Sequence, residues 1–246
     1  MTSQTEPQSS QISTVWDRPE PTIRPAPTPL NRERIVRTAI AIADREGLSA
    51  VSLRKVGAAL DVGAMRLYGY MSTKEELLEL MADAVYGEMV AAGPLEAGWR
   101  EALRTIAHRT WQAVRRHPWF GELLAGRPHH GPNALMYLEA SFAALSDTPG
   151  FEDINVAMRA LRAVNAYIIG AAQRQAGERR AQDASGMRRA DWLARDAPYM
   201  IRMLASGQFP QLSRVVRGNA QPPADVVFED GLNFLLDGIE ARILAG

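Results

Sequence analysis

The 246-residue sequence contains no cysteine. This absence excludes disulfide bonds, thiolate metal sites and a cysteine nucleophile, and it agrees with a reducing compartment. Long apolar runs are also missing, because stretches such as residues 166–172 are far too short to cross a bilayer. The N-terminus has no basic region followed by an apolar one, so it does not read as a signal peptide. We therefore expect a soluble, cytoplasmic protein.

Catalytic signatures are missing as well. The sequence has no G-x-S-x-G, no Walker loop, no G-x-G-x-x-G and no H-E-x-x-H motif. It therefore predicts neither an enzyme nor a bound cofactor. His129 and His130 lie in a loop rich in glycine and proline, where they could bind a metal, but adjacent loop histidines without nearby carboxylates are usually solvated. No metal site is predicted.

Basic and acidic residues are equal in number, 28 of each, but they are unevenly distributed. Residues 30–75 contain eight Arg or Lys and five Asp or Glu, whereas the chain after Gly218 contains one Arg and five acids. This separation is what a nucleic-acid-binding head on a neutral body requires. The apolar share of 46% is enough for one large domain or two modest ones.

Strand signals are absent, whereas apolar residues recur at helical spacing from Asn31 onward. The sequence therefore predicts an all-α fold of about nine or ten helices. Asn31 is a suitable N-cap, and Gly or Pro residues separate several of the segments. The expected helices are 31–47, 52–60, 64–70, 73–89, 98–117, 119–124, 133–145, 154–178, 191–205 and 226–244.

Residues 52–74 read as two short helices joined by a tight turn at Asp61, Val62 and Gly63, which is a helix-turn-helix. The positions on shared inner faces are Leu53, Val56, Leu60, Val62 and Leu67. The second helix is then expected to face outward with small or hydrogen-bonding side chains that suit the edges of DNA bases. These outward positions are Ala64, Met65, Arg66, Gly69 and Tyr70.

A third helix is expected to begin with Ser72 as N-cap and Glu75 as its capping-box partner. The backbone amides of its first turn, together with Lys74 and the hydroxyl of Tyr68, could then hold DNA phosphates. Helical spacing alone fits a three-helix scaffold that binds no DNA equally well.

A family resemblance favours DNA binding. Residues 31–89 contain NRERIVRTAIAIADREG, S-x-R-x-V-x-x-x-L-x-V, L-Y and TKEELLELM, and they resemble the DNA-binding domain of the tetracycline-repressor (TetR) family. RRHPWFGELLAGRP, GPNALMYLEA and ALRAVNAYIIGAA resemble the ligand-binding domain of the branch that contains the tetracycline repressor. The resemblance implies an arm (1–29), a helix-turn-helix domain (30–75) and a helical ligand-binding and dimerisation domain (76–246).

Two residues depart from the family pattern. Asp61 stands where the turn usually has glycine, and Asp tolerates the left-handed conformation better than most residues, so we expect the turn to survive. Gly69 stands where a larger residue is usual in the recognition helix. A helical glycine costs about 1 kcal/mol relative to alanine, which leaves the base contacts at this position open.

The resemblance implies a transcriptional repressor that leaves a palindromic operator when a small hydrophobic or polycyclic ligand binds, and that controls an antibiotic export or resistance gene. The alternative is a dimeric ligand-binding or scaffold protein whose helix-turn-helix is purely structural. The predicted DNA-binding residues are Ser52, Arg54, Ala64, Met65, Arg66, Tyr68, Gly69, Tyr70 and Lys74, together with Arg18 and Arg24 of the arm.

The arm is rich in Ser, Thr, Gln and Pro, and we expect it to be extended. Its proline-stiffened segment carries Arg18 and Arg24 directly before the first helix, where homeodomain-type arms enter the minor groove. A solvated tail is the alternative, since the arm has two arginines against three acids. An arm containing Trp and Pro is similar to that of antibiotic-export repressors such as the simocyclinone-export repressor.

The expected body combines apolar helices with a few polar and aromatic side chains, as a ligand cavity does. The predicted ligand-binding residues are Trp111, His117, Phe120, Asn133, Met136, Tyr137, Asn165, Ile169, Gln173 and Trp192. The resemblance also implies a homodimer through a four-helix bundle of residues 154–178 and 226–244. Packing of the same faces within one chain fits the spacing equally well.

Overall fold

The computed structural model describes residues 14–21, 29–95, 98–146, 148–218 and 222–244. These residues contain eleven α-helices, one short 3-10 helix and no strand, so the all-α prediction is confirmed. The chain forms two compact units, the first from Met1–Gly93 and Gly126–Leu138 and the second from Pro94–Ala125 and Glu139–Gly246. Helix α7 (Pro132–Ser146) contributes residues to both units.

The first unit begins with α1 (Arg32–Glu46), whose ends follow the predicted signals. The side chain of Asn31 accepts a hydrogen bond from the backbone amide of Arg34 at 2.8 Å and caps the helix. Gly47, at φ 84°, ends it. A 3-10 turn, η1 (Leu48–Ala50), leads to the helix-turn-helix.

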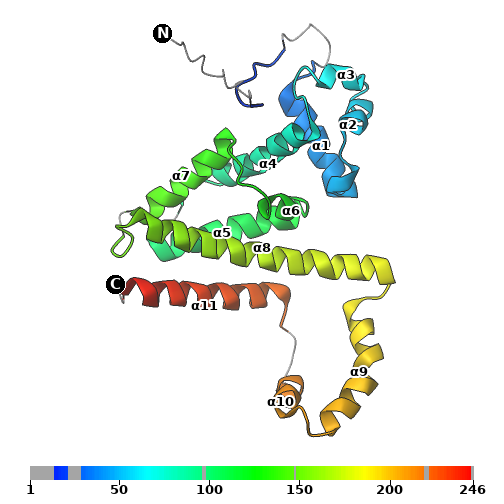
Figure 1. The fold of residues 1–246 in the computed structure, drawn as a ribbon, viewed down its shortest axis with the longest axis vertical. Coiled ribbons are helices and arrows are strands. Elements are labelled where there is room, and N and C mark those ends of the chain that lie inside the picture. The colour runs from blue at the N-terminus through cyan, green and yellow to red at the C-terminus, as the bar shows by residue number, and fades with distance from the viewer. Residues whose placement is uncertain (1–13, 22–28, 96–97, 147, 219–221, 245–246) are drawn as a thin grey trace, which may run out of the picture. The chain divides into compact units, whose positions relative to one another are not determined.

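The helix-turn-helix consists of α2 (Leu53–Ala59) and α3 (Ala64–Leu67), which lie beside α1 in Figure 1. Asp61 adopts the left-handed conformation expected of it, at φ 56°. The two helices approach closely at Gly57, where a Cβ atom would lie 2.9 Å from the carbonyl oxygen of Val62. Only glycine fits this approach without displacing the backbone.

Helix α4 (Lys74–Ala91) begins one residue later than the predicted capping box implies. The N-cap is Thr73, whose hydroxyl accepts a hydrogen bond from the amide of Glu76 at 3.1 Å, and not Ser72. A carboxylate oxygen of Glu76 in turn accepts a hydrogen bond from the amide of Ser72 at 2.6 Å. The prediction of Ser72 and Glu75 as the capping pair is therefore wrong.

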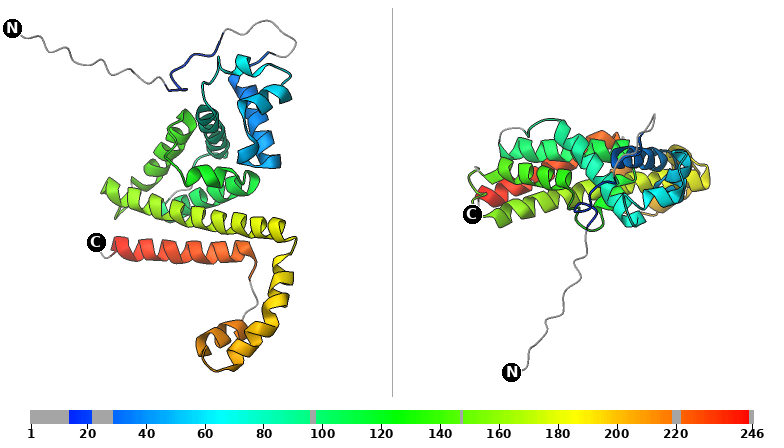
Figure 2. Two further views of the ribbon diagram at one scale, coloured as in Figure 1. Left: turned by 45° about the vertical axis from the view of Figure 1, so that its right-hand side comes forward. Right: turned by 90° about the horizontal axis from the view of Figure 1, so that it is seen from above.

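The second unit is built around α5 (Trp99–Arg116), α8 (Ile154–Ser185) and α11 (Ala224–Leu244), with the short α6 (Phe120–Leu124) packed on α5 and α8. Helices α8 and α11 run side by side in Figures 1 and 2. The ring of Trp111 stacks on Phe228 with centroids 4.5 Å apart and planes 9° apart, which joins α5 to α11 inside the core.

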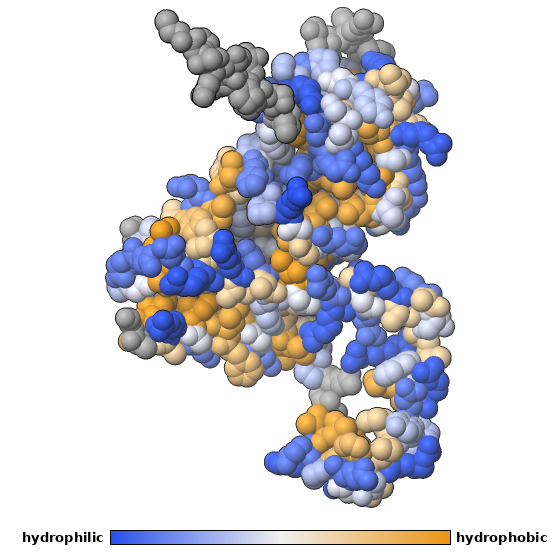
Figure 3. Space-filling view, in the orientation of Figure 1, coloured by the Kyte–Doolittle hydropathy of each residue, from blue (hydrophilic) through white to orange (hydrophobic). Residues whose placement is uncertain are grey.

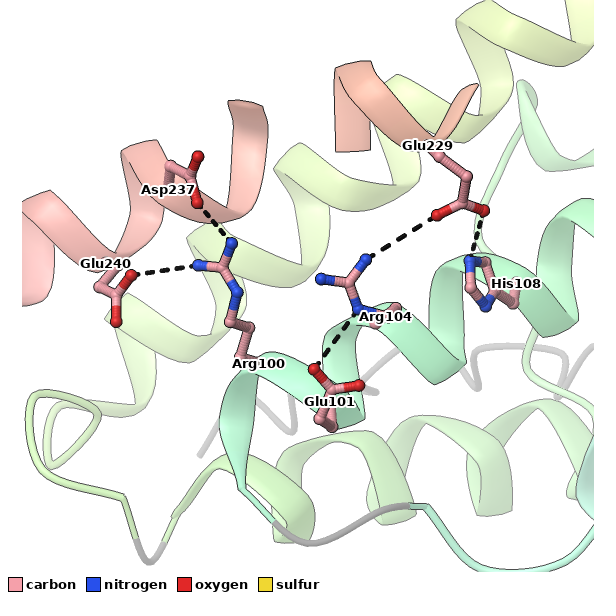
Figure 4. A network of polar contacts seen from close by, with 7 residues as sticks. All are labelled: Arg100, Glu101, Arg104, His108, Glu229, Asp237 and Glu240. Carbon is pink, nitrogen blue, oxygen red and sulfur yellow. Dashed lines mark hydrogen bonds and ion pairs between the residues drawn. The ribbon is translucent and has the colours of Figure 1, made fainter. Parts of the chain in front are cut away.

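Charged side chains also connect α5 and α11 at the surface of this unit (Figure 4). Arg100 pairs with Asp237 and Glu240, with 3.1 Å between its Nη1 and Oε2 of Glu240. His108 Nε2 lies 2.7 Å from Oε1 of Glu229. These pairs are partly exposed, so each contributes little to stability compared with the apolar contacts beneath.

Helices α9 (Arg189–Ala205) and α10 (Pro210–Gly218) follow the C-terminal end of α8. Helix α10 is absent from the predicted set, and α8 extends to Ser185, beyond the predicted end at residue 178. Residues 189–218 are all described, and none of their side chains is buried. Figure 3 shows apolar side chains gathered over α10.

Across the described residues no helix has the length and apolar character needed to cross a membrane.

Candidate nucleic-acid interface

The outward face of α3 is the candidate for reading DNA bases. Met65 is 80% exposed, Tyr68 is 48% exposed and Arg66 is also exposed, whereas Leu67 between them is fully buried. Leu67 therefore fixes the helix to the unit and leaves the other side chains free on its outer surface. Ala64 is half-buried at the start of the helix.

The prediction that Tyr70 faces outward on this helix is wrong. Helix α3 ends at Leu67, and the chain then turns so that Tyr70 is only 6% exposed. Its hydroxyl donates a hydrogen bond to the carbonyl oxygen of Leu30 at 2.7 Å. Tyr70 therefore ties the turn after α3 to the chain just before α1.

The remaining predicted positions flank α3. The hydroxyl of Ser52 accepts a hydrogen bond from the amide of Lys55 at 3.2 Å and so caps α2, and Arg54 is exposed on the first turn of that helix. Lys74 is half-buried as the first residue of α4. Gly69 is exposed beyond the end of α3, so it carries no helix-propensity cost there.

The two arginines predicted for the arm have different outcomes. Arg18 forms a two-pronged ion pair with Glu76, at 2.8 Å from Nη1 to Oε2 and 2.9 Å from Nη2 to Oε1. This pair holds the pKa of the Glu76 carboxyl below its usual value, chiefly through the hydrogen bonds from Arg18. Arg24 lies outside the described residues.

One predicted ligand-binding residue of the first unit, Asn133, contacts a buried carboxylate. Asp83 is 4% exposed, and it accepts hydrogen bonds from the amide of Ala134 and from Nδ2 of Asn133, both at 2.9 Å. Burial raises the pKa of Asp83, although both hydrogen bonds oppose the shift. Gly131 permits this arrangement, since a Cβ there would lie 2.3 Å from Oδ1 of Asp83. Asn133 thus connects α7 to α4.

Tyr137 is 7% exposed, with its ring centroid 6.0 Å from that of Tyr86, whereas Met136 is 54% exposed. Burial raises the pKa of Tyr86 to about 12.

The expectation that the loop histidines are both solvated is wrong for His129, whose side chain is only 7% exposed. Its Nδ1 lies 3.1 Å from Oε2 of Glu79.

The other seven predicted ligand-binding residues belong to the second unit. Trp111 and His117 are 7% and 5% exposed, and Phe120 is fully buried. His117 and Phe120 both contact the ring of Trp119. The remaining positions are more open: Ile169 is half-buried, whereas Asn165, Gln173 and Trp192 are exposed in the protomer.

Three features of the first unit escaped the sequence analysis. Asp83 and the pairing of Arg18 with Glu76 depend on contacts between residues more than 50 positions apart, whereas Gly57 depends on the close approach of the consecutive helices α2 and α3. A local signal existed for one of them, since Thr73 and Glu76 also match the capping-box spacing.

Comparison with known proteins bears on the role of this fold. A family model described as the C-terminal domain of tetracyclin repressor-like proteins matches residues 92–243, which is more than half of the chain. The chain belongs to the TetR family. The HTH-type transcriptional repressor DrrR1 of Streptomyces coeruleorubidus is 34% identical over 234 residues, which cover 94% of this chain and 85% of that protein.

Two further relatives agree. An HTH-type transcriptional regulator of Saccharopolyspora erythraea is 36% identical over 201 residues, covering 80% of this chain and 81% of its own. The crystal structure of apo ActR from Streptomyces coelicolor has a TM-score of 0.73 and 26% identity, covering 89% of this chain and 98% of ActR. This TetR-family protein is accordingly a transcriptional repressor rather than an enzyme. Regulators of the family bind operator DNA and small ligands and act as dimers.

Proposed function

We propose that a homodimer of this protein represses transcription by binding a two-fold symmetric operator, and that it leaves the operator when a small hydrophobic or polycyclic compound enters the helical body. We further propose that the controlled gene serves antibiotic export or resistance. The observation that carries the DNA-binding part is the outer face of α3, where Met65, Arg66 and Tyr68 are exposed around the buried anchor Leu67.

These three side chains match two kinds of DNA contact. An arginine can donate two hydrogen bonds to the edge of a guanine, and the apolar Met65 suits the methyl group of a thymine. The hydroxyl of Tyr68 is suited to a phosphate, as are Lys74 and the amides at the start of α4. Arg54 on α2 adds a further positive charge on the same unit.

Helix α11 supports dimerisation because it presents two apolar faces. Phe228, Leu232 and Leu236 are buried within the protomer. Phe234, which is 76% exposed, and Ile239 instead line an open groove of about 850 Å³ between α8 and α11. The helix thus serves its own core with one face and retains a second apolar face for the matching helices of another copy.

The apolar side chains of α9 and α10 give independent support for a second copy. Tyr199, Ile201, Val215 and Val216 are each between 48% and 66% exposed, although a folded monomer rarely leaves so many large apolar residues uncovered on one segment. An intersubunit contact would remove this surface from water.

The ligand is proposed from the aromatic side chains of the body. Trp111, His117 and Phe120 are aromatic side chains buried in the body, and pockets for flat organic molecules are lined by side chains of this kind. A crystal structure of ActR in complex with actinorhodin shares this fold, with a TM-score of 0.72 and 24% identity. A small organic effector is therefore proposed here, acting through a difference in affinity between the DNA-binding and released conformations.

The test is the affinity for DNA from the region upstream of the protein's own gene. Arg66→Ala is expected to lose about 1–3 kcal/mol of binding and to relax sequence preference, whereas Lys74→Ala weakens binding to every sequence. Arg127→Ala, at an exposed arginine in the loop before α7, is the matched control and is expected to bind like the wild type. Equal binding by the Arg66 and Lys74 variants and the wild type would instead favour a purely structural helix-turn-helix.

A further inference from the structure

The N-terminal segment, residues 14–21, is folded against the first unit. Val15 is only 3% exposed. The carbonyl oxygen of Arg18 accepts a hydrogen bond from Nη2 of Arg32 at 3.0 Å, and Oε2 of Glu20 accepts one from the amide of Arg32 at 3.1 Å. The segment is thus held by buried apolar contact and by hydrogen bonds to the first residue of α1.

The same segment reaches the end of the recognition helix. A Cβ atom on Gly69 would lie 3.2 Å from Cγ of Pro21, so the absence of a side chain at Gly69 gives the segment room. Nη2 of Arg32 also donates to the carbonyl oxygen of Tyr70 at 3.4 Å. Residues 14–21, the start of α1 and the turn after α3 therefore form one connected group.

Within this group, Glu76 is a carboxylate in a part of the molecule proposed to face DNA phosphates. It lies in the first turn of α4, two residues after Lys74, and it also holds the amide of Ser72 in the preceding turn. An unpaired carboxylate here would repel phosphates, whereas pairing with a guanidinium offsets its charge while keeping the hydrogen bond to Ser72.

We propose that Arg18 is a positioning residue for operator binding, which acts by neutralising Glu76 and does not contact DNA itself. This inference rests on the proposed DNA-binding function. Each Nη atom of Arg18 donates a hydrogen bond to Glu76, and the side chains of Arg18 and Glu76 are only 25% and 20% exposed. If Arg18 inserted into a DNA groove, it would have to break its ion pair with Glu76. The negative charge of Glu76 would then face DNA without a partner.

The experiment compares operator affinity for Arg18→Gln, Glu76→Gln and the double variant of the full chain. Arg18→Gln is expected to weaken binding about 2–10-fold, because it leaves the Glu76 charge exposed to phosphates. The double variant is expected to bind within about two-fold of the wild type, since no unpaired charge remains. Thermal unfolding and light scattering of each variant establish that folding and association are intact.

Glu75→Gln combined with Arg18→Gln is the matched control, because Glu75 is an exposed carboxylate in the same turn. If only the net charge of the protein mattered, both double variants would bind the operator equally well. If Arg18 contacted DNA directly, both double variants would bind weakly. Either result overturns the proposal, as does wild-type affinity of Arg18→Gln. The proposal is supported if operator affinity returns when Glu76→Gln is added to Arg18→Gln but not when Glu75→Gln is added. Failure of the wild type to bind any upstream DNA would instead overturn the proposed function, and this inference with it.

Discussion

The hydroxyl of Tyr70 donates a hydrogen bond to the carbonyl oxygen of Leu30 across 2.7 Å. The two residues are 40 positions apart in sequence, and both are buried. Their contact fixes the turn after α3 to the chain at the start of α1. The orientation of the recognition helix therefore depends on a residue that does not itself face outward.

Tyr70→Phe should lower the free energy of unfolding by about 1–3 kcal/mol, because it leaves a buried carbonyl oxygen without its donor. Tyr68→Phe removes the same atom from a side chain that is 48% exposed and should leave stability unchanged. Denaturant unfolding of both variants measures the difference. If Tyr70→Phe matched the wild type in stability, the Leu30 contact would not contribute to holding this turn.

Gly57→Ala should destabilise the protein by about 1–3 kcal/mol and weaken operator binding, since the added methyl group would lie 2.9 Å from the backbone of Val62 and push α3 away from α2. Gly63→Ala is the control, because a Cβ there meets no atom within 4 Å. Unfolding and DNA affinity are measured for both. Equal behaviour of the two variants would show that α2 and α3 do not need this close approach.

Local signals in the sequence predicted much of the fold. The Asn31 cap and Gly47 set the bounds of α1, and Asp61 was expected in the left-handed conformation that it adopts. These features depend on residues adjacent in the chain, where capping and turn chemistry decide the structure.

The errors arose where distant contacts decide. The end of α3 at Leu67 depends on Tyr70 turning inward to reach Leu30, which spacing alone does not reveal. At the start of α4, both Ser72 with Glu75 and Thr73 with Glu76 fit the capping-box spacing. The structure uses Thr73 and Glu76, and Glu76 also pairs with Arg18, which is 58 positions away. The two apolar faces of α11 cannot be told apart by helical spacing, because only packing against α5 and α8 decides which face is buried within the protomer.

Apolar packing should dominate over surface charge in attaching α11 to its unit. Phe228→Ala removes the ring stacked on Trp111 and should cost about 3–5 kcal/mol, whereas Arg100→Ala breaks the exposed pairs with Asp237 and Glu240 of Figure 4 and should cost about 0–1 kcal/mol. Denaturant titrations at low and high salt measure both. A larger loss for Arg100→Ala would reverse this order.

Phe234→Glu should convert the proposed dimer to monomers, because it places a charge in the apolar groove between α8 and α11. Leu135→Glu introduces the same charge at a residue of α7 that is 48% exposed and should leave the dimer intact. Light scattering at micromolar protein gives the mass of each variant. A dimeric Phe234→Glu protein would place the subunit contact elsewhere.

Hydroxyl-radical footprinting of the wild-type protein on its own upstream DNA tests the central claim most directly. The account predicts two protected half-sites related by two-fold symmetry, with centres about 10 base pairs apart or a multiple of that spacing, and it predicts that Arg66→Ala loses both half-sites together. A single unsymmetrical footprint, or a symmetrical one that is unchanged by Arg66→Ala, would contradict a dimer that reads its operator through α3.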